Sequence, residues 1–165
     1  SDSDSSSTMT SSVIENNAVY LRTIDRDVQE DARRAIFNGK GQGQVAFTSS
    51  FATDLTPYSK ANSTLELTVR LTDKASLSPE QSVYLAMACG GECLGRLDLS
   101  KALSSMKVNE WRTLNIDLQC FEQKGADISK IISPFVLSSS APLSIDFTDV
   151  FIKPNNAEQA NISCQ

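Results

Sequence analysis

The stretch Tyr84–Phe121, YLAMACGGECLGRLDLSKALSSMKVNEWRTLNIDLQCF, decides the expected fold. At its start, Leu85, Met87 and Cys89 alternate with small or polar residues, which is the pattern of a half-buried strand. A compact Cys-Gly-Gly-Glu-Cys turn and a short polar segment follow. A second alternating segment then begins after Trp111, the only tryptophan of the chain, and stops at the dipeptide Cys-Phe. Alternating segments separated by compact turns predict antiparallel β structure.

The same two-residue period recurs elsewhere in the chain. It is clearest at residues 64–72, where apolar side chains alternate with Thr, Glu and Arg. Such alternation places the apolar side chains on one face of a strand. Further strands are expected at residues 19–23, 33–37, 44–48, 83–89, 113–118, 136–137 and 143–147, and single helical turns at 98–103 and 127–131. Many short strands with one polar face each predict an all-β fold, an antiparallel two-sheet jelly-roll sandwich.

The composition limits the functions open to the chain. Its 165 residues, 40% of them hydrophobic, suffice for one domain. Lys and Arg total 15 against 20 Asp and Glu, and the net charge of -5 argues against nucleic-acid binding. The same charge disfavours strongly anionic polysaccharides, unless a local basic patch overrides the average. No apolar run approaches membrane-spanning length, so membrane insertion is not expected.

The chain has no histidine, which excludes several kinds of site. Catalysis by Ser-His-Asp or Cys-His groups and histidine-based zinc sites are ruled out. A carboxylate-based hydrolase would need two carboxylates at catalytic separation. Nothing in the sequence places the outward-facing Glu66 and Asp117 together. The chain itself is therefore not expected to be an enzyme.

Cys89, Cys93, Cys120 and Cys164 are the disulfide candidates. Four cysteines allow three pairings, and the sequence does not choose among them. If Cys89 and Cys93 close a loop across the glycines, the other two pair with each other or stay reduced. A four-cysteine zinc site is the rival interpretation, but its paired short spacing occurs once at most. An even count favours an exported location, periplasmic, outer-surface or extracellular.

Composition also divides the chain into three parts. Residues 1–17 are Ser-rich, have no apolar signal-peptide core and predict a disordered interdomain linker. Residues 18–154 form the expected β-sandwich module. Residues 155–165 are a polar C-terminal tail, expected to be frayed as far as Cys164.

Several motifs occur in a fixed order along the module: residues 24–26 and 29–34, Phe37 before Asn38-Gly39, residues 89–93, 98–99, 110–114, 118–121, 125–127, 134–137 and 149–150. The ordered set resembles the C-terminal domain of bacterial glycoside hydrolase family 3 exo-β-glucanases (glucan glucohydrolases and β-glucosidases). The family commonly has tryptophan where Phe37 stands, and Cys164 is an addition to its pattern.

The resemblance implies a galactose-binding-like β-sandwich and an accessory role. The implied function is a non-catalytic carbohydrate-binding module of a β-glucan-degrading enzyme, whose catalytic residues belong to other domains. Its implied partners are β-glucan or gluco-oligosaccharides and the catalytic domains of the parent enzyme. The alternative is a structural domain that packs on those catalytic domains without binding sugar itself.

Trp111 is the first candidate for sugar binding. A regular strand places it on the same polar face as Asn115 and Asp117. Sugars are bound by a flat apolar ring, which meets their C–H face, and by planar polar groups, which meet their hydroxyls. Tyr84, on another polar strand face, and Tyr58, in a loop-like segment, are further candidates. The alternative for each ring is packing against a loop or the core, the commoner role of aromatic residues.

Asp149 is a candidate calcium ligand. Apolar residues at 143–147 share one parity and those at 150–152 the other, which predicts a β-bulge at Thr148-Asp149. Calcium takes several oxygen ligands, and Asp25 or Asp27 would join Asp149 if the first and last strands adjoin. The alternative is a bulge carboxylate in solvent. No other cofactor is expected.

The segment Gln29–Arg34, QEDARR, carries four charges in six residues. One interpretation is that Arg33 and Arg34 lie at an interface with a partner domain or a sugar. The other is that the charges form local ion pairs, which contribute little when exposed. Both interpretations stay open at the level of the sequence.

Overall fold

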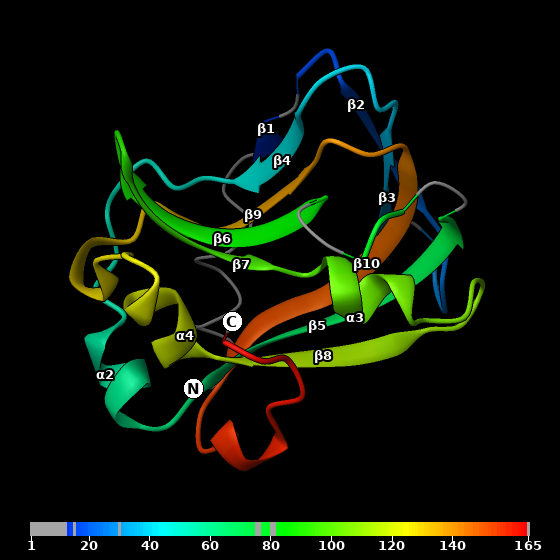
Figure 1. Ribbon diagram of the computed structural model, residues 1–165. Helices are drawn as coiled ribbons and strands as arrows, with labels where there is room; N and C mark the ends of the chain where they lie inside the picture. The colour runs from blue at the N-terminus through cyan, green and yellow to red at the C-terminus, as the bar shows by residue number, and fades with distance from the viewer. Residues whose placement is uncertain (1–12, 15, 30, 75–76, 80–81, 165) are drawn as a thin grey trace.

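The computed structural model describes residues 13–14, 16–29, 31–74, 77–79 and 82–164, which form two packed antiparallel sheets (Figure 1). Sheet A has the order β1 (Val13–Ile14), β4 (Gly43–Phe47), β9 (Ser133–Ser139), β6 (Val83–Gly90) and β7 (Cys93–Asp98). Sheet B has the order β2 (Val19–Ile24), β3 (Ala32–Phe37), β10 (Leu143–Lys153), β5 (Thr64–Asp73) and β8 (Arg112–Asp117). The predicted all-β two-sheet sandwich is confirmed.

Helices are short and lie outside the sheets. In the described residues they are α2 (Thr56–Lys60), α3 (Ser100–Ser104) and α4 (Leu118–Gln123), with 3-10 turns η1 (Ile128–Lys130) and η2 (Ala157–Gln159). Figure 1 shows α2 and α4 together at the end of the sandwich where β8 finishes, and α3 nearer the end where β8 begins.

The core lies between the two sheets, as the alternation predicts. The inward-facing residues of β5 (Leu65, Leu67, Val69 and Leu71) are at most 1% exposed. Phe135 of β9 in sheet A lies between two further rings, Phe47 of β4 and Phe147 of β10, with ring centroids 5.2 Å away in both cases. Because Phe147 belongs to sheet B, this aromatic cluster joins the two layers.

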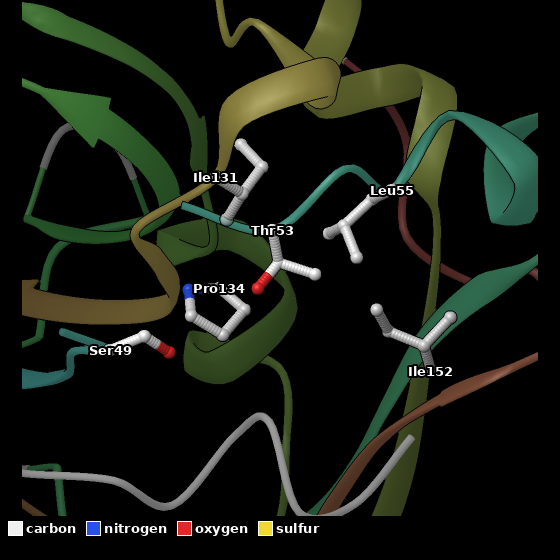
Figure 2. A pocket seen from close by; sticks show the side chains of 6 residues that line it. All are labelled: Ser49, Thr53, Leu55, Ile131, Pro134 and Ile152. Carbon is white, nitrogen blue, oxygen red and sulfur yellow. The ribbon is translucent and has the colours of Figure 1, made fainter. Parts of the chain in front are cut away.

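A small cavity remains beneath the loop that joins β4 to α2. Its volume is about 10 Å³, and Figure 2 shows the side chains that line it: Ser49, Thr53, Leu55, Ile131, Pro134 and Ile152. This space is near the minimum for one water molecule. This cavity is therefore too small to hold a sugar.

The strand predicted at 113–118 ends one residue early, and a helix missed by the sequence follows it. Leu118 begins α4, because the Asp117 side chain accepts a hydrogen bond from the Gln119 N–H and caps the helix. Strand β7 was also missed. Its alternation is weak because Gly95 and Leu97 are its only buried residues.

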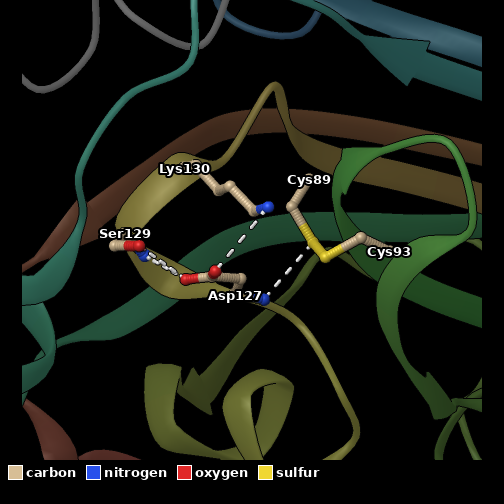
Figure 3. The surroundings of a disulfide bond; sticks show 5 residues. All are labelled: Cys89, Cys93, Asp127, Ser129 and Lys130. Atoms are coloured by element: carbon tan, nitrogen blue, oxygen red, sulfur yellow. Dashed lines mark hydrogen bonds and ion pairs between the residues drawn. A yellow bond between two sulfur atoms is a disulfide. The ribbon is translucent and has the colours of Figure 1, made fainter.

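The predicted turn after Asp127 is confirmed as η1, and it is tied to the Cys-Gly-Gly-Glu-Cys hairpin (Figure 3). The Asp127 carboxylate accepts hydrogen bonds from the hydroxyl and N–H of Ser129, which lower the pKa of Asp127 below its ordinary value. The Asp127 N–H donates to Cys89 Sγ at 3.3 Å, and Cys89 forms a disulfide with Cys93.

The C-terminal tail is not frayed, contrary to the expectation from its polarity. Asn161 pairs with the edge strand β8: its N–H donates to the Asn115 carbonyl oxygen at 2.9 Å, and its Oδ1 accepts from the Asn115 N–H at 2.8 Å. A disulfide joins Cys164 to Cys120 of α4. The tail therefore covers backbone groups that an edge strand would otherwise present to another chain.

The folded part also begins earlier than the predicted boundary at residue 18. Val13–Ile14 form β1 and pair with Ala46 and Phe47 of β4. Residues 1–12 and 15 of the predicted disordered linker lie outside the described residues.

Candidate functional site

A row of charged residues ending in Trp111 crosses the outer face of sheet B. In the sheet register, Arg22 of β2 lies opposite Arg34 of β3, Arg34 opposite Asp146 of β10, and Asp146 opposite Arg70 of β5. Trp111 immediately precedes β8, and its ring centroid lies 4.6 Å from the guanidinium carbon of Arg70. We refer to these five residues as the cross-strand row.

Asp146 is the centre of the row. Its carboxylate accepts from Arg34 Nε at 2.6 Å and Nη2 at 3.0 Å, and from Arg70 Nε at 3.0 Å and Nη2 at 2.8 Å. Asp146 is fully buried although it points outward, whereas the side chains of Arg34 and Arg70 are 22% and 25% exposed. The hydrogen bond to Asp146 raises the pKa of Arg34. The carboxylate thus fixes two guanidinium groups whose other edges reach the surface.

Trp111 contacts a second cation. The guanidinium carbon of Arg26 lies 4.9 Å from the ring centroid, and Arg26 Nη1 donates to Asp149 at 2.8 Å. Cations attract the negative face of an aromatic ring. Trp111 is half-buried. The ring is therefore already contacted by two guanidinium groups and is not a free aromatic surface for a sugar.

The loop that carries Arg26 is itself anchored. The Asp31 carboxylate accepts from the backbone N–H groups of Arg26, Asp27 and Val28 at 2.6, 3.0 and 3.2 Å. These hydrogen bonds, that of Asp27 first, lower the pKa of Asp31. The carbonyl oxygen of Asp31 accepts from Thr148 Oγ1 of β10 at 2.7 Å. The position of Arg26 beside Trp111 is set by this loop.

Asn115 and Asp117, predicted beside Trp111, do not lie near it. Four residues of extended strand separate Trp111 from Asn115, about 13 Å. Asn115 is 8% exposed, and its Oδ1 accepts from Thr64 and from Asn156. Asp117 caps α4 at the far end of β8. Both polar groups stabilise the fold at these positions.

The two predicted tyrosines lie elsewhere again. Tyr84 is on the outer face of sheet A, where Arg96 stacks over its ring at 4.2 Å. Tyr58 lies in α2, not in a loop, and packs against the core. Figure 1 shows α2 at the opposite end of β8 from the start of the strand, where Trp111 lies. The structure does not bring the predicted sugar-binding residues into one site.

The surroundings of Asp149 do not fit a calcium ion. The predicted bulge is present, because the register between β10 and β5 shifts between Thr148 and Phe151 and Asp149 has φ of 53°. However, Asp149 pairs with the cation Arg26, and Asp27 lies 3.8 Å from the same guanidinium. In the part of the chain that the structure describes, no three His, Cys, Asp or Glu side chains group as metal ligands.

The family of the chain can be identified from its sequence. The model of a family described as galactose-binding domain-like, Exop_C, matches residues 1–152. The chain belongs to the Exop_C family. No curated protein sequence matches this Exop_C domain.

Solved structures share the fold of the Exop_C domain. The exo-1,3/1,4-β-glucanase ExoP from a Pseudoalteromonas species matches with 22% identity and a TM-score of 0.67, over 88% of this chain and 16% of that one. Its extra C-terminal domain alone matches with 23% identity and a TM-score of 0.63, over 84% and 71%. A family 30 carbohydrate-binding module of a cellulosomal cellulase from Clostridium thermocellum matches with 17% identity and a TM-score of 0.62, over 85% and 84%.

The chain thus spans a small part of the whole glucanase that it resembles. Within the described residues of the Exop_C domain, no helix is long and apolar enough to cross a membrane.

The sequence pointed to Trp111 but not to Arg70, which contacts its ring, or to Asp146, which binds Arg70. Their signal was present, since both are charged residues at outward-facing positions of alternating strands. Residues 70 and 146 meet only because β5 pairs with β10. Strand order was the information that the sequence did not provide.

Proposed function

We propose that this Exop_C domain is a non-catalytic accessory module of an exported, β-glucan-degrading glycoside hydrolase of family 3, and that it binds glucan chains on the outer face of sheet B. The observation that carries the proposal is the cross-strand row, which combines an aromatic ring with two guanidinium groups fixed by a buried carboxylate. Fixed planar donors beside a ring suit the hydroxyls and the C–H face of a sugar.

Weak binding would suffice for such a module. Covalent linkage to an enzyme raises the effective concentration of the module near its substrate. Trp111 is half-buried and already contacts two guanidinium groups, so a sugar would share the ring with them. This geometry favours weak affinity over tight binding.

Export is supported by the covalent bonds of the fold. All four cysteines are paired, as Cys89–Cys93 and Cys120–Cys164. Structural disulfides persist in oxidising compartments. We therefore place the module in the periplasm, on the outer surface or outside the cell.

A second candidate function is docking on the catalytic domains of the parent enzyme without independent sugar binding. It is favoured by Tyr20 and Ile36, which lie opposite each other on β2 and β3 beside the row and are 60% and 36% exposed. Arginine, tyrosine and tryptophan are enriched in protein interfaces.

The test is calorimetric titration of the chain with β-1,3- and β-1,4-linked gluco-oligosaccharides, with tryptophan fluorescence followed in parallel. Sugar binding predicts a saturable response that Trp111→Ala abolishes. Tyr84→Ala is the matched control, because it removes a cation-stacked ring from sheet A. Absence of heat and of any spectral change at millimolar sugar would argue against sugar binding and favour the docking function.

A further inference from the structure

We propose that the cross-strand row prefers glycans that carry carboxylates, such as chains containing uronic acids, over neutral glucan. This inference rests on the proposed sugar-binding function and names the ligand class of the same face. The net charge of the chain is -5, which disfavours anionic ligands in general. The row is a local exception, because three arginines and one aspartate give it a net charge of +2.

One of the two uncompensated positive charges is at Arg22. The Asp146 carboxylate accepts four hydrogen bonds from Arg34 and Arg70 and offsets one of their two positive charges. Arg22 lies opposite Arg34 in the register, and like charges in this position repel each other. Among the described residues, no carboxylate lies within ion-pair distance of Arg22. A carboxylate from a ligand placed between Arg22 and Arg34 would relieve this repulsion.

The chemistry of the guanidinium group favours a carboxylate over a hydroxyl at this position. Arginine binds carboxylates through two parallel hydrogen bonds, and such charged hydrogen bonds are roughly twice as strong as neutral ones. Arg22 is exposed, and the side chain of Arg34 is 22% exposed. Both can therefore reach a ligand on the surface.

The direction of the row favours a glycan over a compact anion. Adjacent strands are about 4.8 Å apart, so the row from β2 to β8 extends roughly 19 Å. Successive pyranose rings of an extended β-linked chain repeat at a similar spacing. Such a chain laid across the strands would place a sugar over Trp111 and a carboxylate near Arg22.

The experiment compares a β-1,4-linked oligoglucuronate with a cello-oligosaccharide of equal length, which carries a hydroxymethyl group in place of each carboxylate. Binding is followed by calorimetry and by the fluorescence of Trp111, the only tryptophan. We expect the oligoglucuronate to bind about tenfold more tightly at low salt, with the advantage shrinking at high salt because ions screen exposed charges.

Two single-residue variants test whether Arg22 is responsible for the preference for oligoglucuronate. Arg22→Gln should weaken oligoglucuronate binding about tenfold and weaken binding of the cello-oligosaccharide by much less, because the neutral sugar has no carboxylate for Arg22 to bind. Arg96→Gln on sheet A removes the same charge from the other layer and should change neither.

Three results would overturn the inference. Equal affinity for the two ligands would remove the preference while leaving sugar binding intact. Binding of polyglutamate as tight as that of oligoglucuronate would identify an acidic protein surface as the natural partner. Absence of binding by either sugar would reject the sugar-binding function itself.

Discussion

Asp146 holds Arg70 from the neighbouring strand through one oxygen, Oδ2, which accepts from Nε at 3.0 Å and from Nη2 at 2.8 Å. The same carboxylate also holds Arg34 from the strand on its other side. One fully buried charge therefore fastens three adjacent strands on a face that would otherwise be open to water. Both the fold and the candidate site depend on it.

We expect Asp146→Asn to lower the free energy of unfolding by about 3 kcal/mol, because it leaves two guanidinium groups without their counter-charge. Urea denaturation monitored by circular dichroism measures the loss. The control is Asp27→Asn, at a side chain that is 77% exposed and 3.8 Å from Arg26, which should change stability by less than about 1 kcal/mol. Equal effects of the two variants would show that Asp146 is not the fastening group.

The two disulfides should contribute unequally to stability. Cys120–Cys164 closes 44 residues and Cys89–Cys93 closes 4. Loop-closure entropy assigns about 4 kcal/mol to the first and about 2 kcal/mol to the second. We therefore expect Cys164→Ser with Cys120→Ser to lower the urea midpoint further than the corresponding pair at 89 and 93. The reverse order would mean that the C-terminal tail remains in place without its covalent bond.

Gly95→Ala should destabilise the module by about 2–3 kcal/mol, because β7 has no space for a side chain there. A Cβ at this position would clash with the carbonyl oxygen of Phe121 and lie 2.8 Å from the Ala126 nitrogen. Gly91→Asn is the control, since no atom lies within 4 Å of its Cβ position and asparagine tolerates its φ of 57°. Thermal denaturation of the two variants tests the contrast, and a Gly95→Ala variant as stable as the parent would contradict it.

Local patterns in the sequence were enough to predict most of the fold. Alternation located β5 and β6, and the phase change after Phe147 located the bulge at Asp149. Strand β7 was missed because Gly95 interrupts its apolar face. Helix α4 was missed because the leucine that begins it continues the alternation of β8.

The candidate site was harder to predict because its contacts join distant parts of the chain. Asp146 lies 112 residues from Arg34 and 76 from Arg70. Alternation placed Arg70 on a polar strand face, but the order of strands in the sheet determines which charged residues meet. Trp111 could be proposed from its type alone, whereas its partners Arg26 and Arg70 could not.

Asp31 gives the module a stability that depends on pH. Three backbone N–H groups of the loop from Arg26 to Val28 donate to its carboxylate, and they lower its pKa in the folded state. A group whose pKa is lower when folded stabilises the fold above its unfolded pKa, near 3.8, and this contribution is lost as the pH falls through the folded pKa.

Replacing Asp31 by asparagine should therefore lower the melting temperature at neutral pH and reduce its fall below about pH 4, where the unfolded aspartate begins to bind protons. Melting curves of the parent and of Asp31→Asn from neutral pH to acid would measure this difference. Because the loop also positions Arg26 beside Trp111, the fluorescence of Trp111 in the folded variant should change at neutral pH as well. Parallel melting curves at every pH would show that the carboxylate does not hold the loop.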